Sequence, residues 1–111
     1  MSSVKHVTAQ TFKQEVLQST VPVLVEFYTT WCPSCRAMEP ALQALAQELE
    51  GRAKVVQVNV EDEPFLASEY QITAVPTFIL FKGGLLRSGY RCAMPVSALK
   101  AAIDRLNDQA A

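Results

Sequence analysis

Apolar residues recur along the chain at two spacings, and these spacings predict an alternation of strands and helices. Residues 21–29 are almost continuously apolar, which is typical of a strand buried on both faces of a sheet. From Cys32 to Leu49 the apolar positions recur every three or four residues, which predicts an amphipathic helix. Pro40 falls inside this helix, removes a backbone hydrogen bond and is expected to bend the helix axis.

The other segments continue this alternation. Residues 55–60 and 77–82 predict two strands, and Gly83-Gly84 predicts a hairpin into a last strand at 85–91. The remaining expected elements are a strand at 4–7, a helix from Thr8 or Thr11 to about Gln18, a short helix at 64–70, and a C-terminal helix carrying Val96, Leu99, Ile103 and Leu106. The order βαβαβαββα predicts an α/β fold with a mixed sheet, and we expect one domain over residues 1–111.

Composition and charge exclude several classes of protein. The 111 residues are 50% hydrophobic, which is enough to bury a core without disulfide staples or a structural metal. The formal net charge is only -1, so the chain lacks the basic surface that nucleic acid or an anionic membrane would require. The apolar stretch at 71–81 is about half of the roughly 20 residues that a membrane span needs. We therefore expect neither a nucleic-acid nor a membrane partner.

The first residues contain no apolar segment of the kind found in secretory signals, so we expect a cytoplasmic protein. In that compartment thiols are kept reduced, and a C-x-x-C pair is more often redox-active or metal-binding than structural. The chain has three cysteines, and Cys92 is left over once Cys32 and Cys35 are paired.

Cys32 and Cys35 lie where the buried strand meets the long helix. Residues three apart on a helix have β-carbons about 5–6 Å apart, so this pair can close to a disulfide with little backbone movement. Cys32 opens the helix, where unpaired amides and the macrodipole lower a thiol pKa by about one unit. Cys35 lies one turn further in and is expected to be more shielded and to keep its proton. Cys32 is therefore the expected nucleophile and Cys35 the resolving cysteine.

The cysteine pair also fits two roles outside redox exchange. Cys92 and His6 would complete four zinc ligands, but zinc pairs usually come as two local pairs on turns, and these two residues are isolated in the sequence. The pair could also be structural by coincidence. We favour redox exchange that uses no metal and no other cofactor.

The sequence around the cysteines resembles the thioredoxin family, and the resemblance covers nearly the whole chain. Residues 25–36, VEFYTTWCPSCR, look like the family's active-site segment, and Pro40 matches its helix-kinking proline. Residues 74–77, AVPT, look like the loop whose proline is cis, and residues 81–84, FKGG, match the hairpin that follows. The resemblance implies the thioredoxin fold, with a central mixed five-stranded sheet flanked by about four helices. It also implies a monomer that exchanges disulfides with protein substrates and receives electrons from a thioredoxin-reductase-type donor.

Glu26 is a lone carboxylate among apolar neighbours, so we expect it to be buried and its pKa to be raised. The alternative is a glutamate at the rim with an ordinary pKa. In the family an aspartate at this position assists deprotonation of the resolving cysteine, which implies that Glu26 accepts the Cys35 proton. Gln57 stands where a lysine is usual in the family, and losing that positive neighbour should raise the Glu26 pKa further.

The resemblance also implies a substrate groove beside the cysteines. The backbone at Val75, next to Pro76, would pair with an incoming substrate strand. Trp31 is expected to be a surface flap beside the site rather than a core aromatic. Pro33-Ser34 replaces the family's commonest Gly-Pro between the cysteines and is expected to tune the reduction potential, in a direction the sequence leaves open.

Cys92 stands where the family carries a glycine beside that groove. From the residues alone it is a small apolar filler at a strand end. The resemblance opens a second interpretation, in which the thiol crowds a bound peptide, accepts glutathione or forms an alternative disulfide with Cys32.

We therefore interpret the chain as a thiol-disulfide oxidoreductase that reduces protein disulfides through a Cys32/Cys35 cycle. One alternative is a specialised disulfide exchanger with a dedicated partner, because the unusual dipeptide and Cys92 would narrow substrate choice. Another is a redox-poor binding module that uses the groove near Val75 and Trp31.

Overall fold

The structure is a computed structural model, and it describes residues 4–108. These residues form a five-stranded sheet in the order β1-β3-β2-β4-β5. The strands are β1 (Lys5–His6), β2 (Val23–Tyr28), β3 (Lys54–Asn59), β4 (Thr77–Lys82) and β5 (Leu85–Tyr90). β1, β3 and β2 run parallel, whereas β4 and β5 are antiparallel to their neighbours. The predicted mixed sheet is thus confirmed, with β2 at its centre.

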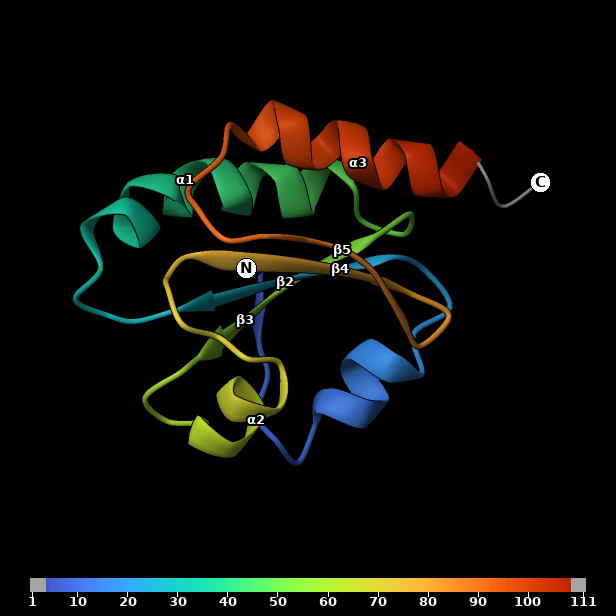
Figure 1. The fold of residues 1–111 in the computed structure, drawn as a ribbon. Coiled ribbons are helices and arrows are strands. Elements are labelled where there is room, and N and C mark those ends of the chain that lie inside the picture. Colours follow the sequence, from blue (N-terminus) through green and yellow to red (C-terminus); the bar gives the residue numbers. More distant parts are fainter. Residues whose placement is uncertain (1–3, 109–111) are drawn as a thin grey trace.

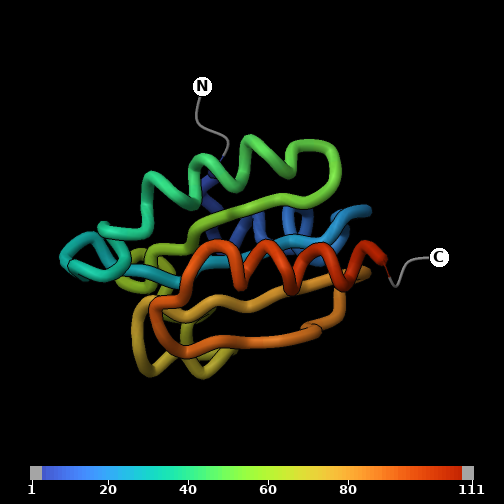
Figure 2. The backbone as a smooth tube through the Cα atoms, turned by 90° about the horizontal axis from the view of Figure 1, so that it is seen from above, coloured from blue at the N-terminus to red at the C-terminus, as the bar shows by residue number. Residues whose placement is uncertain are grey.

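Helices cover both faces of the sheet (Figure 1). α1 (Pro33–Glu48) and α3 (Val96–Asp108) lie on one face, and α2 (Pro64–Glu69) and the π-helical turn η1 (Lys13–Leu17) lie on the other. Seen from above, α1 and α3 run side by side along the sheet (Figure 2). The α/β class and the expected five-stranded mixed sheet flanked by helices are therefore confirmed.

Each face of the sheet has its own apolar core, and β2 contributes to both. Leu24 belongs to the core under α1 and α3, whereas Val25 and Phe27 belong to the core under η1 and α2. Successive side chains on a strand point to opposite faces, so Glu26 faces the same side as Leu24. The carboxylate of Glu26 is thereby directed toward the helix that carries the cysteines.

The first helix differs from the prediction. The expected helix from Thr8 or Thr11 to Gln18 is reduced to η1, in which the Gln18 amide donates to the Lys13 carbonyl, five residues back, at 2.9 Å. Phe12 and Val16 are buried against the sheet. We attribute the wide turn to the packing of these two side chains, which competes with regular α-helical hydrogen bonding.

The local signals around the long helix and the hairpin are confirmed. Cys32 is the N-cap of α1, Pro33 occupies its first turn and Pro40 lies inside it. Gly84 has a φ of +79°, and a Cβ at this position would lie 2.9 Å from the Leu17 carbonyl oxygen, so the hairpin requires glycine here. The cysteines follow the C-terminal end of β2, and the hairpin lies at the opposite end of the sheet, where Phe81 pairs with Val23.

Candidate active site

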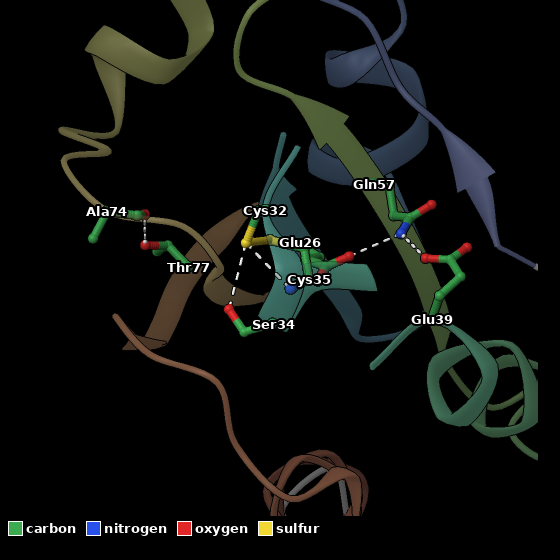
Figure 3. Close-up of a disulfide and its surroundings, with 8 residues drawn as sticks. All are labelled: Glu26, Cys32, Ser34, Cys35, Glu39, Gln57, Ala74 and Thr77. Carbon is green, nitrogen blue, oxygen red and sulfur yellow. Dashed lines mark hydrogen bonds between the residues drawn. A yellow bond between two sulfur atoms is a disulfide. The ribbon is translucent and has the colours of Figure 1, made fainter. Parts of the chain in front are cut away.

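A disulfide joins Cys32 and Cys35 where the chain leaves β2 and enters α1 (Figure 3). Their Cα atoms are 5.3 Å apart, within the usual range for a disulfide. Both residues are 3% exposed, so the expected difference in shielding between them is not seen in the disulfide form.

Hydrogen bonds distinguish the two sulfur atoms instead. The Cys32 Sγ accepts the backbone N–H of Cys35 at 3.2 Å and lies 3.4 Å from the Ser34 Oγ. Because a disulfide sulfur carries no proton, the Ser34 hydroxyl is the donor in that contact. Both donors would also stabilise negative charge on this sulfur after reduction.

Glu26 lies fully buried on β2, as predicted, with 0% of its surface exposed. Its Oε1 accepts a hydrogen bond from Gln57 Nε2 at 2.8 Å. Burial raises the pKa of the Glu26 carboxyl to about 7; the Gln57 hydrogen bond lowers it, and the negative charge of Glu39 raises it further. The alternative of a rim-facing glutamate with an ordinary pKa is therefore wrong.

A pocket of about 370 Å³ opens beside the disulfide on the α1 side. Its walls include Cys35 and Gln57, so the resolving cysteine and the partner of Glu26 share one cavity. His6 and Tyr28 line its outer part, where the Tyr28 hydroxyl lies 3.2 Å from His6 Nδ1. His6 is therefore part of the pocket wall and is held there by its contact with Tyr28.

The loop before β4 carries the other predicted contacts. The Val75–Pro76 peptide bond is cis, as the resemblance implied, and Thr77 Oγ1 donates to the Ala74 carbonyl oxygen at 2.7 Å. Pro76 is buried and Val75 is half-buried. Trp31 is 65% exposed, which excludes a core aromatic and agrees with a surface position.

Comparison with known proteins identifies the group to which this site belongs. Residues 3–105 match the family model described as Thioredoxin. The chain is 44% identical over 105 residues to thioredoxin 1 of Nostoc sp., covering 95% of this chain and 98% of that relative. It is 41% identical over 103 residues to thioredoxin of Porphyra purpurea, covering 93% and 96% of the two chains. It is also 41% identical over 105 residues to thioredoxin 1 of Synechococcus elongatus, covering 95% and 98%.

The chain belongs to the thioredoxin family. It is accordingly a protein-disulfide oxidoreductase, and the Cys32–Cys35 disulfide fits a dithiol–disulfide cycle. The resemblance derived from the active-site segment is therefore confirmed, and with it the fold and the class of reaction.

The thioredoxin-family fold exposes Cys92, which lies beyond the end of β5 and is in no disulfide within residues 4–108. The interpretation of Cys92 as a packed apolar filler is wrong, because the chain leaves the sheet at Tyr90 before it reaches this residue. Its thiol is open to solvent.

The described residues contain neither a cluster of metal ligands nor a membrane-spanning helix. No group of three or more His, Cys, Asp or Glu side chains within residues 4–108 is arranged to hold a metal ion. Over the same range, no helix combines the length and the apolar character needed to cross a membrane.

Sequence reasoning missed Glu39. Its Oε2 accepts from the same Gln57 nitrogen at 2.8 Å (Figure 3). Glu39 follows Cys35 by four residues, and residues at that spacing share a helix face. That spacing was the one local signal, but it does not show that the shared face meets Gln57 across the sheet.

Proposed function

We propose that this thioredoxin-family chain reduces disulfides of protein substrates, with Cys32 as the nucleophile and Cys35 as the resolving cysteine. The observation that carries the proposal is the hydrogen bonding of Cys32 Sγ at the N-cap of α1. The backbone N–H of Cys35 and the Ser34 hydroxyl both stabilise a thiolate at that atom, and the thiolate is the attacking form.

The reaction proceeds in two exchange steps. The Cys32 thiolate attacks a substrate disulfide, a mixed disulfide forms, and one substrate sulfur leaves as a thiolate that takes up a proton. Cys35 then loses its proton and attacks Cys32 Sγ, which forms the Cys32–Cys35 disulfide and releases the second substrate sulfur. The substrate disulfide has gained two electrons and the cysteine pair has lost two.

Glu26 is the proposed acceptor of the Cys35 proton. It is fully buried behind the pair on β2, and its pKa of about 7 suits exchange of a proton near neutral pH. Its hydrogen-bond partner Gln57 lines the same pocket as Cys35. Glu26 therefore takes the place of the family's aspartate with one methylene more.

Trp31, Val75, Pro76 and Cys92 are the proposed substrate-binding residues. Exposed Trp31 offers a rigid apolar surface beside the disulfide. The backbone at Val75 would pair with an extended substrate segment, which reads main chain more than side chains. Cys92, with its exposed thiol, is proposed to act in redox regulation next to this groove.

Pro33 and Ser34 are the proposed determinants of the reduction potential. Pro33 occupies the first turn of α1, and the Ser34 hydroxyl contacts the Cys32 sulfur. A donor to the thiolate stabilises the reduced form, so this dipeptide is expected to make the pair more oxidising than it would be without the hydroxyl.

The cellular setting follows from this chemistry. We propose a cytoplasmic protein of one domain spanning residues 1–111, since an exposed thiol such as Cys92 is compatible with a reducing compartment. The radius of gyration of 12.8 Å agrees with the roughly 13 Å expected for one compact domain of this length. The reaction groups come from one chain, which supports a monomer, and the oxidised pair would be reduced again by a thioredoxin-reductase-type donor.

The test is to trap the mixed disulfide. Cys35→Ser should form a stable covalent complex with insulin through Cys32, detected by mass spectrometry, because the resolving thiol is gone. Cys32→Ser should form no such complex and should not accelerate insulin reduction by dithiothreitol. A complex trapped through Cys35 or Cys92 would overturn the assigned roles. No activity in the wild-type protein would instead favour a redox-poor binding module.

A further inference from the structure

The carboxylate of Glu26 faces a polar neighbour from each of two other elements. Glu26 on β2 and Gln57 on β3 are register partners in the parallel part of the sheet. Directly opposed residues of neighbouring strands point to the same face, which here is the face covered by α1. Glu39 on α1 contacts the Gln57 amide from the side away from Glu26 (Figure 3). Three elements thus bring a glutamine between two carboxylates.

The Gln57 amide is shared equally by the two acids. Its Nε2 lies 2.8 Å from Glu26 Oε1 and 2.8 Å from Glu39 Oε2. A side-chain amide nitrogen carries two hydrogens, so both are used in these contacts. The other Glu39 oxygen accepts from Gln43 Nε2 at 3.1 Å. Glu39 is therefore held in place by an amide on each side.

The second oxygen of Glu26 differs from the first. Glu26 Oε2 is buried and has no hydrogen-bond partner among the described residues. A buried carboxylate oxygen without a donor is costly when charged, and the cost falls when that oxygen takes up a proton and the group becomes neutral. Because Oε1 already accepts from Gln57, Oε2 is the atom where a proton is best placed.

The charged and titratable groups around Glu26 come from several elements. α1 contributes Glu39, the Cys35 thiol after reduction, and Arg36 on the pocket wall. β2 contributes Tyr28, whose hydroxyl contacts His6 of β1, and β4 places apolar Phe78 opposite Glu26. Glu39 makes no ion pair within residues 4–108, so no cation from that part of the chain cancels its charge by direct pairing.

We propose that Gln57 and Glu39 are positioning residues of the resolving step: the shared amide holds Glu26 by Oε1 so that Oε2 takes the Cys35 proton, while Glu39 keeps a negative charge beside it. The proposal rests on the proposed role of Glu26 as proton acceptor. In the family a lysine is usual at position 57 and gives the buried acid a cationic partner. In this chain the neutral amide of Gln57 takes that place, and the negative charge of Glu39 lies on the other side of the amide.

The experiment compares Glu39→Gln, Gln57→Met and the control Glu50→Gln, which removes the same charge from an exposed site beyond the other end of α1. Carbon NMR would follow the titration of the Glu26 carboxyl in the oxidised protein. Glu39→Gln should lower the Glu26 pKa by about one unit, because a nearby negative charge is lost. Gln57→Met should raise it, because the donor to Oε1 is lost. Glu50→Gln should leave it unchanged.

The same variants would be measured in single-turnover reduction of insulin as a function of pH. The pH at which the rate of the resolving step inflects should be lower in Glu39→Gln and higher in Gln57→Met, in step with the Glu26 pKa. A titration of Glu26 that moves in neither variant would overturn the positioning roles. A shift of the Glu26 pKa without a shift in the pH inflection of the resolving step would overturn the role of Glu26 as proton acceptor. It would still show that Gln57 and Glu39 position the Glu26 carboxyl. The expected shifts of the Glu26 pKa have opposite signs in the two variants. A general destabilisation of the fold would not produce opposite shifts.

Discussion

The two faces of the sheet carry different kinds of interior. Under η1 and α2 the core is apolar and aromatic, with the rings of Phe12 and Phe81 at 5.8 Å and those of Phe12 and Tyr70 at 5.4 Å. Under α1 and α3 the core is also apolar, but it encloses Glu26 and its partner Gln57. The same strand, β2, supplies Phe27 to the first face and Glu26 to the second.

The two faces of β2 therefore serve different purposes: one stabilises the fold, and the other supplies a group to the redox site. Burying an aromatic ring contributes favourably to folding, whereas burying a carboxylate with one unpaired oxygen costs free energy. The face that carries the cysteines therefore holds a group that weakens the fold at neutral pH. We infer that the apolar face compensates for it, and four substitutions test this division.

The largest expected effect is on the apolar face. Phe27→Ala should lower the free energy of unfolding by about 3–5 kcal/mol, because it removes a fully buried ring and leaves a cavity. Urea denaturation would measure the loss. Phe65→Ala is the matched control, since Phe65 is 87% exposed and its truncation should change stability by less than about 0.5 kcal/mol. Equal losses in the two variants would contradict the assignment of this face.

The second prediction concerns the buried acid and the pH dependence of stability. The Glu26 pKa is about 7 in the folded protein against 4.5 for an ordinary glutamate, so the folded state keeps the proton to higher pH. Stability from this group is therefore full below pH 4.5 and is lost as pH rises through about 7, by roughly 3 kcal/mol in total.

Denaturation at several pH values would measure this loss in the oxidised protein. Glu26→Gln should remove most of the fall, because the amide does not titrate, while Glu50→Gln should retain it. Parallel curves for the wild type and Glu26→Gln would show that the carboxyl is not the source of the pH dependence.

The third prediction sets the exposed ring against the buried one. Trp31→Ala should leave the free energy of unfolding within about 0.5 kcal/mol of the wild type, because the side chain is 65% exposed. It should weaken substrate binding by about tenfold, seen as a higher KM for insulin with kcat retained. Phe65→Ala again serves as the control and should leave KM unchanged. A large loss of stability in Trp31→Ala would place this ring with the core instead.

The smallest effect is expected beside the disulfide. Ser34→Ala removes the hydroxyl that lies 3.4 Å from Cys32 Sγ. Losing about 1 kcal/mol of thiolate stabilisation should lower the reduction potential by about 20 mV and raise the Cys32 pKa. Equilibration with glutathione would measure the potential, and exposed Ser68→Ala is the control. A rise in potential would show that the hydroxyl favours the disulfide.

Much of this architecture could be predicted because the signals are local. The apolar run at 21–29 that contains β2, the helix opened by Cys32 and Pro33, and the hairpin at Gly84 each depend on neighbours within a few residues. Burial of Glu26 was also predictable, since its neighbours on the strand are apolar. Local backbone preferences and side-chain periodicity act in the same way wherever the segment lies in the fold.

Other features were not predictable from local pattern. The threonines near residue 11 favour a helix start, yet packing of Phe12 and Val16 on the sheet leaves only η1. Cys92 was expected to pack as a small apolar filler at a strand end, but it lies exposed just beyond the end of β5. In both cases tertiary packing or the actual end of a strand prevailed over a weak local preference.

The sequence by itself determined the thioredoxin fold, the reactive pair Cys32 and Cys35, and a buried acid at position 26. Only the tertiary structure decided that Gln57 and Glu39 meet at this acid, because Gln57 lies 31 residues from Glu26 and 18 residues from Glu39 in the chain. Strand register and helix docking bring the three side chains together. Such contacts depend on how three elements pack, which no single segment encodes.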